Sequence, residues 1–135
     1  MPRTILIAAP DASVRERIVQ IAHDTGYRVL KAQTVVEMLA ALDACPISGV
    51  VIDEQLLRGC DLRRLLVRAQ VLVISKDRRE PMSEEVTVVS KDVAAAELMA
   101  TLVSVMGDPR YHGPRFAVPM SAISVDIDDK SKSAA

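Results

Sequence analysis

The stretch Gly49-Val50-Val51-Ile52-Asp53 decides the fold of this chain. Three consecutive β-branched residues, with no polar residue among them, are typical of a strand that is buried on both faces, as in a parallel sheet. The run ends abruptly in a carboxylate. Because the functional sites of open α/β sheets lie just beyond the carboxyl ends of the strands, Asp53 is the first candidate site residue.

Four further apolar runs alternate with helical patterns along the chain. Apolar residues recur at helical spacing between the runs, which indicates amphipathic helices. This alternation predicts an α/β protein with a doubly wound, five-stranded parallel sheet. The four additional strands are expected at residues 4–9, 27–32, 71–75 and 86–90.

Aspartates are the expected N-caps of three of these helices, because a carboxylate can accept hydrogen bonds from the first free amides. They are Asp11, Asp61 and Asp92. Within the first helix, Arg15 is expected to face water. Residues 54–60 are expected to form a loop that leads into a short third helix.

Composition bounds the class of protein. The 135 residues are 50% hydrophobic and only 2% aromatic, so the core must be aliphatic. A net charge of −1 gives no electrostatic reason to expect nucleic acid or a membrane surface as partner. No signal peptide or bilayer-spanning run is apparent, and two cysteines are too few for a disulfide framework, so we expect a cytoplasmic protein.

Several short motifs together resemble the receiver domain of two-component response regulators, over Thr4 to about Gly107. They are Ile5-Leu6-Ile7, Gly26-Tyr27, Val51-Ile52-Asp53, Val71-Leu72-Val73-Ile74-Ser75 and Val88-Val89-Ser90-Lys91. The resemblance implies strand order 2-1-3-4-5. It also implies that Asp53 occupies the phosphoacceptor position, Ser75 the hydroxyl position after the fourth strand, and Lys91 the lysine position after the fifth.

The chain departs from receivers directly after its first strand. Receivers carry two acidic residues there, which hold a magnesium ion beside the phosphoacceptor. Here these positions are Ala9 and Pro10, which have no side-chain oxygen, whereas magnesium prefers oxygen ligands. Asp11 comes one position late and is better explained as the helix cap. We therefore expect neither a bound metal nor another cofactor.

The parts that switch in receivers are altered as well. The aromatic residue that receivers place two to three positions before the lysine is replaced by Val88 and Val89. The segments on either side of the fourth strand are short, so the third and fourth helices are expected to be shortened, and the fourth could be missing. In addition, Lys76 could reach toward the pocket beside Ser75.

These departures predict an atypical, phosphorylation-independent signalling module that works by protein–protein interaction and is not an enzyme. A protein partner is expected, and a homodimer is left open. Two alternatives remain for Asp53. It could be a conventional phosphoacceptor, or it could form a structural ion pair with Lys91, which the missing acidic pair favours.

The residues after the last helix form a second unit, so the expected division is 1–107 for the receiver-like domain and 108–135 for a tail. Arg110 and Arg115 precede an alternating run at 116–127, which resembles the start of a PilZ domain. In that family paired arginines bind cyclic di-GMP. This ligand is expected only if a PilZ domain follows; the alternative is a flexible extension.

Overall fold

The structure, a computed structural model, describes residues 3–76 and 86–109. Five parallel strands form one sheet in the order β2-β1-β3-β4-β5. They are β1 (Thr4–Ala8), β2 (Arg28–Ala32), β3 (Gly49–Asp53), β4 (Gln70–Ser75) and β5 (Thr87–Ser90). The helices are α1 (Ala12–Thr25), α2 (Val35–Ala44), α3 (Glu54–Leu57), α4 (Leu62–Arg68) and α5 (Ala95–Met106). The predicted α/β class, the parallel sheet and its strand order are confirmed.

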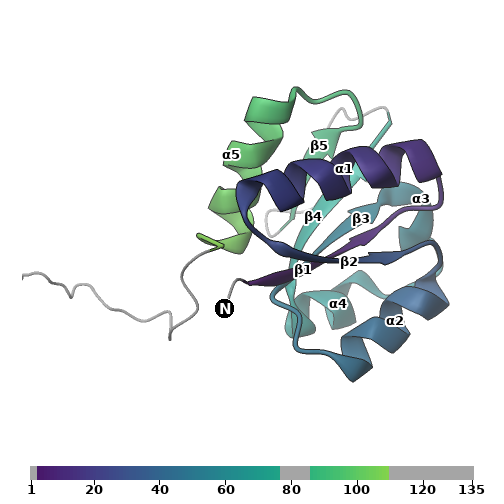
Figure 1. Ribbon diagram of the computed structural model, residues 1–135. Helices are drawn as coiled ribbons and strands as arrows, with labels where there is room; N and C mark the ends of the chain where they lie inside the picture. The colour runs from purple at the N-terminus through teal and green to yellow at the C-terminus, as the bar shows by residue number, and fades with distance from the viewer. Residues whose placement is uncertain (1–2, 77–85, 110–135) are drawn as a thin grey trace, which may run out of the picture.

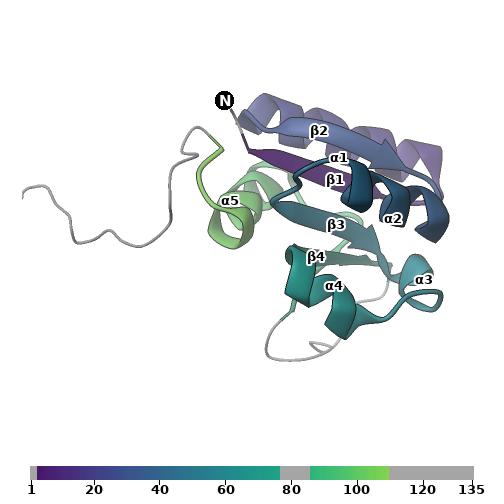
Figure 2. The same cartoon turned by 90° about the horizontal axis from the view of Figure 1, so that it is seen from below.

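Helices cover both faces of the sheet, as Figures 1 and 2 show. Helices α1 and α5 pack on one face, and α2 and α4 on the other. Each face of the sheet has its own hydrophobic core, and the residues of β1 alternate between them. Ile5 and Ile7 pack on the α1/α5 side, and Leu6 and Ala8 on the α2/α4 side. A strand that is buried on both faces needs apolar residues throughout, which explains the unbroken run.

Strand β3 lies in the middle of the sheet, and all five of its residues are buried. Its first residue, Gly49, packs directly against a side chain of α5. A Cβ at Gly49 would lie 2.0 Å from the Met106 sulfur, where the end of α5 packs against the sheet. In the present packing, the Met106 side chain occupies the space that a side chain at Gly49 would need, so a larger residue there would require Met106 to move.

Two of the three predicted aspartate caps are confirmed. The Asp11 carboxylate accepts from the Ser13 amide at 2.8 Å, and the Asp61 carboxylate accepts from the Arg63 amide at 3.0 Å. Helix α4, which Asp61 caps, is short as predicted, with seven residues.

The prediction that Asp92 caps the last helix is wrong. The N-cap of α5 is Ala94, which has no side-chain cap. The chain first makes a turn, in which the Val93 amide donates to the Ser90 carbonyl. This turn leaves Asp92 too far upstream to reach the free amides of α5.

The predicted loop at 54–60 is also partly wrong, because α3 begins directly after β3. The Asp53 carboxylate caps this single turn by accepting from the Gln55 amide at 2.9 Å. The place expected for a shortened fourth helix falls within 77–85, outside the described residues. Arg110 and Arg115 also lie outside them.

None of the helices at 3–76 and 86–109 is long and apolar enough to cross a membrane.

Candidate functional site

Asp53 and Lys91 meet at the carboxyl edge of the sheet, although β4 separates their strands. The Lys91 ammonium lies 3.3 Å from Asp53 Oδ2, and the two side chains are 17% and 1% exposed. Asp53 Oδ1 caps α3, whereas Oδ2 has no hydrogen-bond partner beyond this ion pair. The predicted pairing of Asp53 with Lys91 is therefore present, and Lys91 is the counter-charge of a carboxylate that is almost completely buried.

Ser75 lies at the same edge but contacts a different carboxylate. Its hydroxyl donates to Glu54 Oε1 at 2.9 Å, and its carbonyl accepts from the Lys91 amide at 3.0 Å. Glu54 was not predicted as a site residue. The signal was its position directly after Asp53, which places its side chain at the edge where β3 and β4 end.

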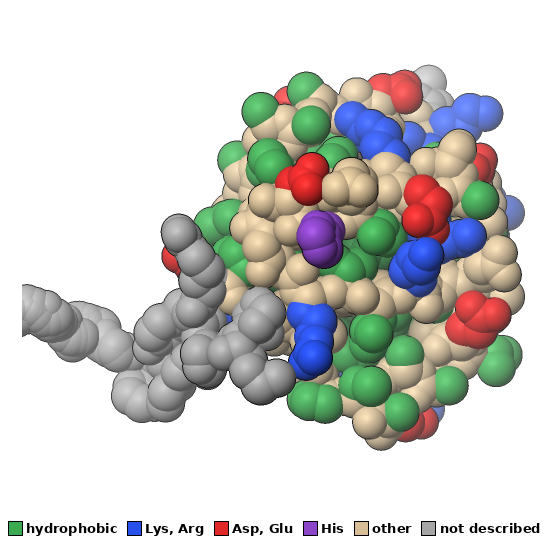
Figure 3. All heavy atoms as spheres, in the orientation of Figure 1, with side chains coloured by type: hydrophobic (Ala, Val, Ile, Leu, Met, Phe, Trp, Pro, Cys, Tyr) green, Lys and Arg blue, Asp and Glu red, His purple; other side chains and the backbone are tan. Residues whose placement is uncertain are grey.

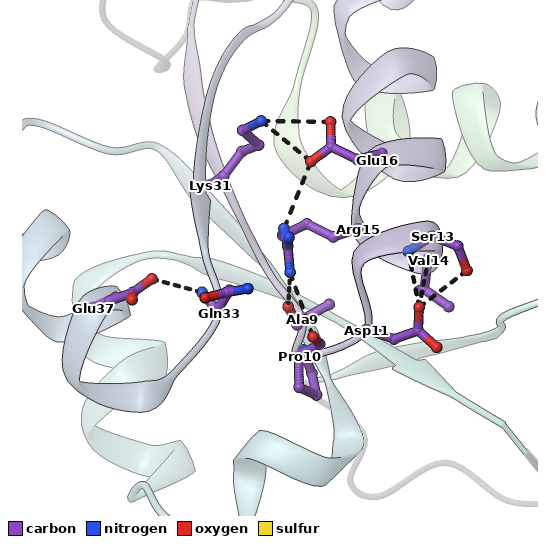
Figure 4. Close-up of polar contacts among 10 residues, drawn as sticks. All are labelled: Ala9, Pro10, Asp11, Ser13, Val14, Arg15, Glu16, Lys31, Gln33 and Glu37. Atoms are coloured by element: carbon purple, nitrogen blue, oxygen red, sulfur yellow. Dashed lines mark hydrogen bonds and ion pairs between the residues drawn. The ribbon is translucent and has the colours of Figure 1, made fainter.

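The two positions that carry acidic residues in receivers present no side-chain ligand. Ala9 is buried, and the carbonyls of Ala9 and Pro10 already accept from a guanidinium: Arg15 Nη1 lies 2.9 Å from the first and 3.5 Å from the second. Figure 4 shows Arg15 turned toward both carbonyls. The prediction that Arg15 faces water is wrong, since the residue is only 9% exposed. Its long side chain runs back over the first turn of α1, which a helical wheel does not reveal.

Arg15 belongs to a chain of charges that reaches the edge strand. Arg15 Nε lies 3.6 Å from Glu16 Oε2, and the Lys31 ammonium on β2 lies 3.2 Å from the same oxygen. Two cations therefore share one carboxylate beside the β1–α1 junction. Their combined charge makes this corner of the molecule less favourable for a further cation.

Asp11 is the one carboxylate that follows β1 closely, and its Oδ1 is committed to α1. Besides the backbone amides, the Ser13 hydroxyl donates to it at 3.0 Å. The Ser13 hydroxyl and the Val14 and Ser13 amides hold the pKa of the Asp11 carboxyl below its ordinary value. The interpretation of Asp11 as a helix cap is confirmed by these contacts.

The magnesium ion that receivers hold does not fit these residues. Magnesium sites need several oxygen ligands in near-octahedral geometry. Asp53 supplies a carboxylate, but Ala9 and Pro10 offer only carbonyls that a guanidinium already binds, and the Asp11 carboxylate caps α1 through its Oδ1. Across the described ranges, no three His, Cys, Asp or Glu side chains come together in a way that could hold a metal ion.

A cleft of about 530 Å³ opens beside the ion pair, and its lining includes Lys76, Lys91, Gln55 and Arg17. Lys76 lines this cleft, but Ser75, beside which it was predicted to reach, is not part of the lining. Arg17 was not predicted to contribute to the site. It donates to the Lys91 and Val93 carbonyls and so fixes the turn that carries Lys91. No sequence signal distinguishes Arg17 from other charged residues on the outside of a helix.

The structure also describes the surroundings of two valines on β5 and of a cysteine. Val88 and Val89, at the positions where receivers carry the switching aromatic, are buried at 6% and 8% exposure, and neither has a ring that could turn. Cys60 is half-buried. Burial, reinforced by the negative charge of Asp61, raises the pKa of the Cys60 thiol, which disfavours the reactive thiolate.

Comparison with known proteins finds likeness in structure rather than in sequence. No protein-family model matches the chain, and no curated protein matches it. Among solved structures, the chemotaxis protein CheY4 of Vibrio cholerae is 16% identical, with a TM-score of 0.66, and the match covers 78% of this chain and 99% of CheY4.

Two other solved structures agree. The signal receiver domain of an HD domain-containing protein from Pseudomonas fluorescens Pf-5 is 14% identical, with a TM-score of 0.67, covering 78% of this chain and 94% of that one. A response regulator receiver domain protein from Bacillus halodurans is 17% identical, with a TM-score of 0.62, covering 77% and 97%. These structures share the five-stranded parallel sheet at low identity. The chain therefore has the fold of a response-regulator receiver domain.

Proposed function

We propose that this chain is an atypical receiver-like signalling module that acts through protein–protein contacts in the cytoplasm and does not require phosphoryl transfer to Asp53. The observation that supports this most strongly is the β1–α1 junction. Where receivers carry two acidic residues, Ala9 and Pro10 present carbonyls that the Arg15 guanidinium binds at 2.9 Å and 3.5 Å. The two positions that would supply metal ligands supply only carbonyls, and a cation of the chain itself, the Arg15 guanidinium, already binds these carbonyls.

Charge explains why this matters for chemistry. A phosphoryl group that approaches Asp53 brings negative charge to a carboxylate, and such transfers depend on cations that neutralise the developing charge. Lys91 is available, but it already neutralises Asp53. Without a divalent ion, the phosphorylated carboxylate would lack most of the neutralisation that this chemistry uses.

The response to phosphorylation would also be weakened. Ser75 donates to Glu54, and Val88 and Val89 offer no ring that could rotate. A ligand shifts a conformational equilibrium only by its differential affinity for the two states. The Ser75 hydroxyl and the Lys91 ammonium both already have partners within the chain. A phosphoryl group on Asp53 would therefore favour one conformation over another only weakly.

The test of phosphorylation is the intact mass of the chain after incubation with a small phosphodonor and magnesium. We expect no stoichiometric mass increase, while a conventional receiver domain treated in parallel gains a phosphoryl group. The double variant Ala9→Asp/Pro10→Asp, checked for native circular dichroism, should label more than the parent. A stoichiometric gain by the parent that disappears in Asp53→Asn would refute phosphorylation independence.

The proposed protein–protein interaction is tested in the native host. Asp53→Ala should leave partner capture and phenotype nearly unchanged in a protein that still folds. Loss of both would instead favour the second candidate, a conventional phosphoacceptor, for which the Asp53–Lys91 contact at 3.3 Å is the supporting observation.

A further inference from the structure

Strand β2 forms one edge of the sheet, and part of its backbone has no partner strand. Among the described strands, β2 pairs only with β1. The Arg28 amide donates to the Arg3 carbonyl, just before β1, so Arg28 directs its backbone groups toward β1. Because the backbone groups of successive strand residues point to opposite sides, Val29 and Lys31 direct theirs away from the sheet. An edge of this kind can pair with a further strand.

A groove of about 770 Å³ lies beside this edge, between α1 and β2. Val19 of α1 and Val29 of β2 are half-buried in its lining, and Tyr27 at its base is buried. Figure 3 shows hydrophobic side chains between α1 and β2, with basic side chains beside them. A further strand on β2 would cover these apolar side chains.

The chain leaves the described domain beside this groove. Pro109, the last described residue, lies next to Gly26, which lines the groove: a Cβ at Gly26 would lie 3.3 Å from Pro109 Cγ. The Pro109 carbonyl also accepts from the Arg3 amide at 3.0 Å. The segment after residue 109 therefore starts beside the amino end of β2.

This segment, residues 110–135, includes a stretch with the pattern of an edge strand. Residues 123–128 read Ile-Ser-Val-Asp-Ile-Asp, so apolar and polar side chains alternate strictly. All three apolar residues are β-branched, and no proline interrupts the stretch, which favours a strand with one buried face. Its six residues match the length of β2, which has five.

The hand of the connection favours the β2 edge over the β5 edge. Helix α5 returns the chain to the amino end of the sheet, so a strand that starts there runs parallel to the others. From β5 to the outside of β2, the chain crosses the sheet in the same direction as in β1–α1–β2, and α5 lies on the same face as α1. The two connections therefore have the same hand. A strand beside β5 would need the opposite hand, whereas such connections are almost always right-handed.

The charges agree with this placement. Arg28 alternates with Leu30 on β2 and so lies on the α2/α4 side of the sheet. It is exposed and forms no ion pair with another described residue. When the apolar residues of 123–128 face the groove on the α1 side, Asp126 lies on the α2/α4 side, where Arg28 is available to it.

We infer that residues 123–128 form a sixth strand, which pairs in parallel with the outer edge of β2 and covers the groove between α1 and β2. The three apolar residues of this strand pack against Val19 and Val29, and its backbone pairs with that of Val29 and Lys31. The occupant of the edge is thus a segment of the same chain, because that segment starts beside the groove and has the matching pattern and hand.

The inference is independent of the proposed function, because neither β2 nor the groove beside it includes Asp53, Ser75 or Lys91. The sixth strand would form whether or not Asp53 accepts a phosphoryl group. The phosphodonor assay and the measurements below can therefore fail separately.

Amide hydrogen exchange of the full chain, followed residue by residue by NMR, tests the inference. We expect the amides of Val29 and Lys31 to be protected. Val125→Asp should accelerate their exchange about tenfold or more, because the burial of one valine side chain has an effect of this size. The matched control is Ser124→Asp, the same change at a side chain that faces away from the groove, which should leave both rates within about twofold. The amides of β3 report whether each variant keeps its fold.

Disulfide trapping tests the direction of the strand. In a Cys45→Ser/Cys60→Ala background, Lys31→Cys is combined with either Ile127→Cys or Ile123→Cys. Lys31 lies near the carboxyl end of β2, so a parallel strand brings residue 127 close to it and keeps residue 123 away. The variant with Ile127→Cys should therefore form the intramolecular disulfide faster, at low protein concentration.

Three results would overturn the inference. The first is exchange of the Val29 and Lys31 amides at the rates of an unstructured peptide. The second is protection that Ser124→Asp reduces as strongly as Val125→Asp does. The third is protection that rises with protein concentration, which would assign the edge to a second copy of the chain. Faster trapping of the variant with Ile123→Cys would exclude the parallel direction.

Discussion

Two parts of the carboxyl edge of the sheet differ sharply in how closely their residues match those of receivers. At the ends of β3 and β5, Asp53 and Lys91 stand 3.3 Å apart, as the resemblance to receivers implies. At the end of β1, the acidic pair is gone, and Arg15 and Asp11 are bound to the backbone of the chain itself. One half of the site has the residue types found in a phosphoacceptor pocket, and the other half is a junction held by bonds within the chain.

The difference shows that the two halves have different structural roles. Asp53 is 1% exposed and also caps α3, so its carboxylate contributes to the fold whether or not it reacts. An acidic pair at the end of β1 would serve mainly a metal, whereas Ala9 and Pro10 contribute carbonyls that Arg15 binds. The carboxylate of Asp53 therefore has a structural role in the fold that does not depend on phosphoryl chemistry.

The largest effect that tests this comparison is expected at Lys91. Lys91→Met leaves the Asp53 carboxylate buried without its counter-charge, which should lower the free energy of unfolding by about 3 kcal/mol. The double variant Lys91→Met/Asp53→Asn removes the buried charge as well and should recover most of this loss. Urea denaturation of both variants measures the difference. If Lys91→Met is as stable as the parent, the ion pair is not a structural element.

The next effect concerns the other half of the site. Arg15→Met keeps the apolar stem but removes the donor to the Ala9 and Pro10 carbonyls, and should cost about 1–2 kcal/mol of unfolding free energy. Arg63→Met is the matched control, because Arg63 is exposed and its side chain makes no ion pair with another described residue, so a change below about 0.5 kcal/mol is expected. Equal effects of the two variants in the same urea titration would contradict a structural role for Arg15.

The smallest effect is a pH dependence at Asp11. Because the pKa of this carboxyl is lowered in the folded state, its contribution to stability is present above the pKa of the unfolded chain, about pH 4, and is lost as pH falls through the lower folded value. Asparagine also caps helices well but does not titrate. Asp11→Asn should therefore lose less stability than the parent between pH 6 and pH 2 in thermal unfolding. Parallel pH profiles of the two proteins would show that the cap does not depend on the charge.

Much of the fold could be predicted from the sequence because its signals are local. The apolar run that ends at Asp53 indicates a central strand without knowledge of its neighbours, and Asp11 and Asp61 act on amides two residues away. The strand order, by contrast, was predicted from the resemblance to receivers and not from a local signal. No local signal determines which strands pair.

The errors share a physical cause. Helical periodicity predicts where the Cβ of Arg15 points, but its guanidinium lies several bonds further on and turns back toward the β1–α1 junction. Asp92 has the residue type of a cap, but the turn before α5 moves it out of reach. Helix α3 has four residues, too few to show a period, so the hydrogen bond between Glu54 and Ser75 could not be predicted, although the position of Glu54 directly after Asp53 was a signal that it lies near the site.

The two ends of the described domain lie together at the edge of the sheet opposite Asp53. The Arg3 amide donates to the Pro109 carbonyl at 3.0 Å, and the Tyr27 hydroxyl lies 3.2 Å from the Leu102 carbonyl of α5. The chain therefore enters and leaves the domain at almost the same point. Such a domain can be spliced into a surface loop of another protein with little strain on its host. Circular permutation should likewise need only a short linker between residues 3 and 109.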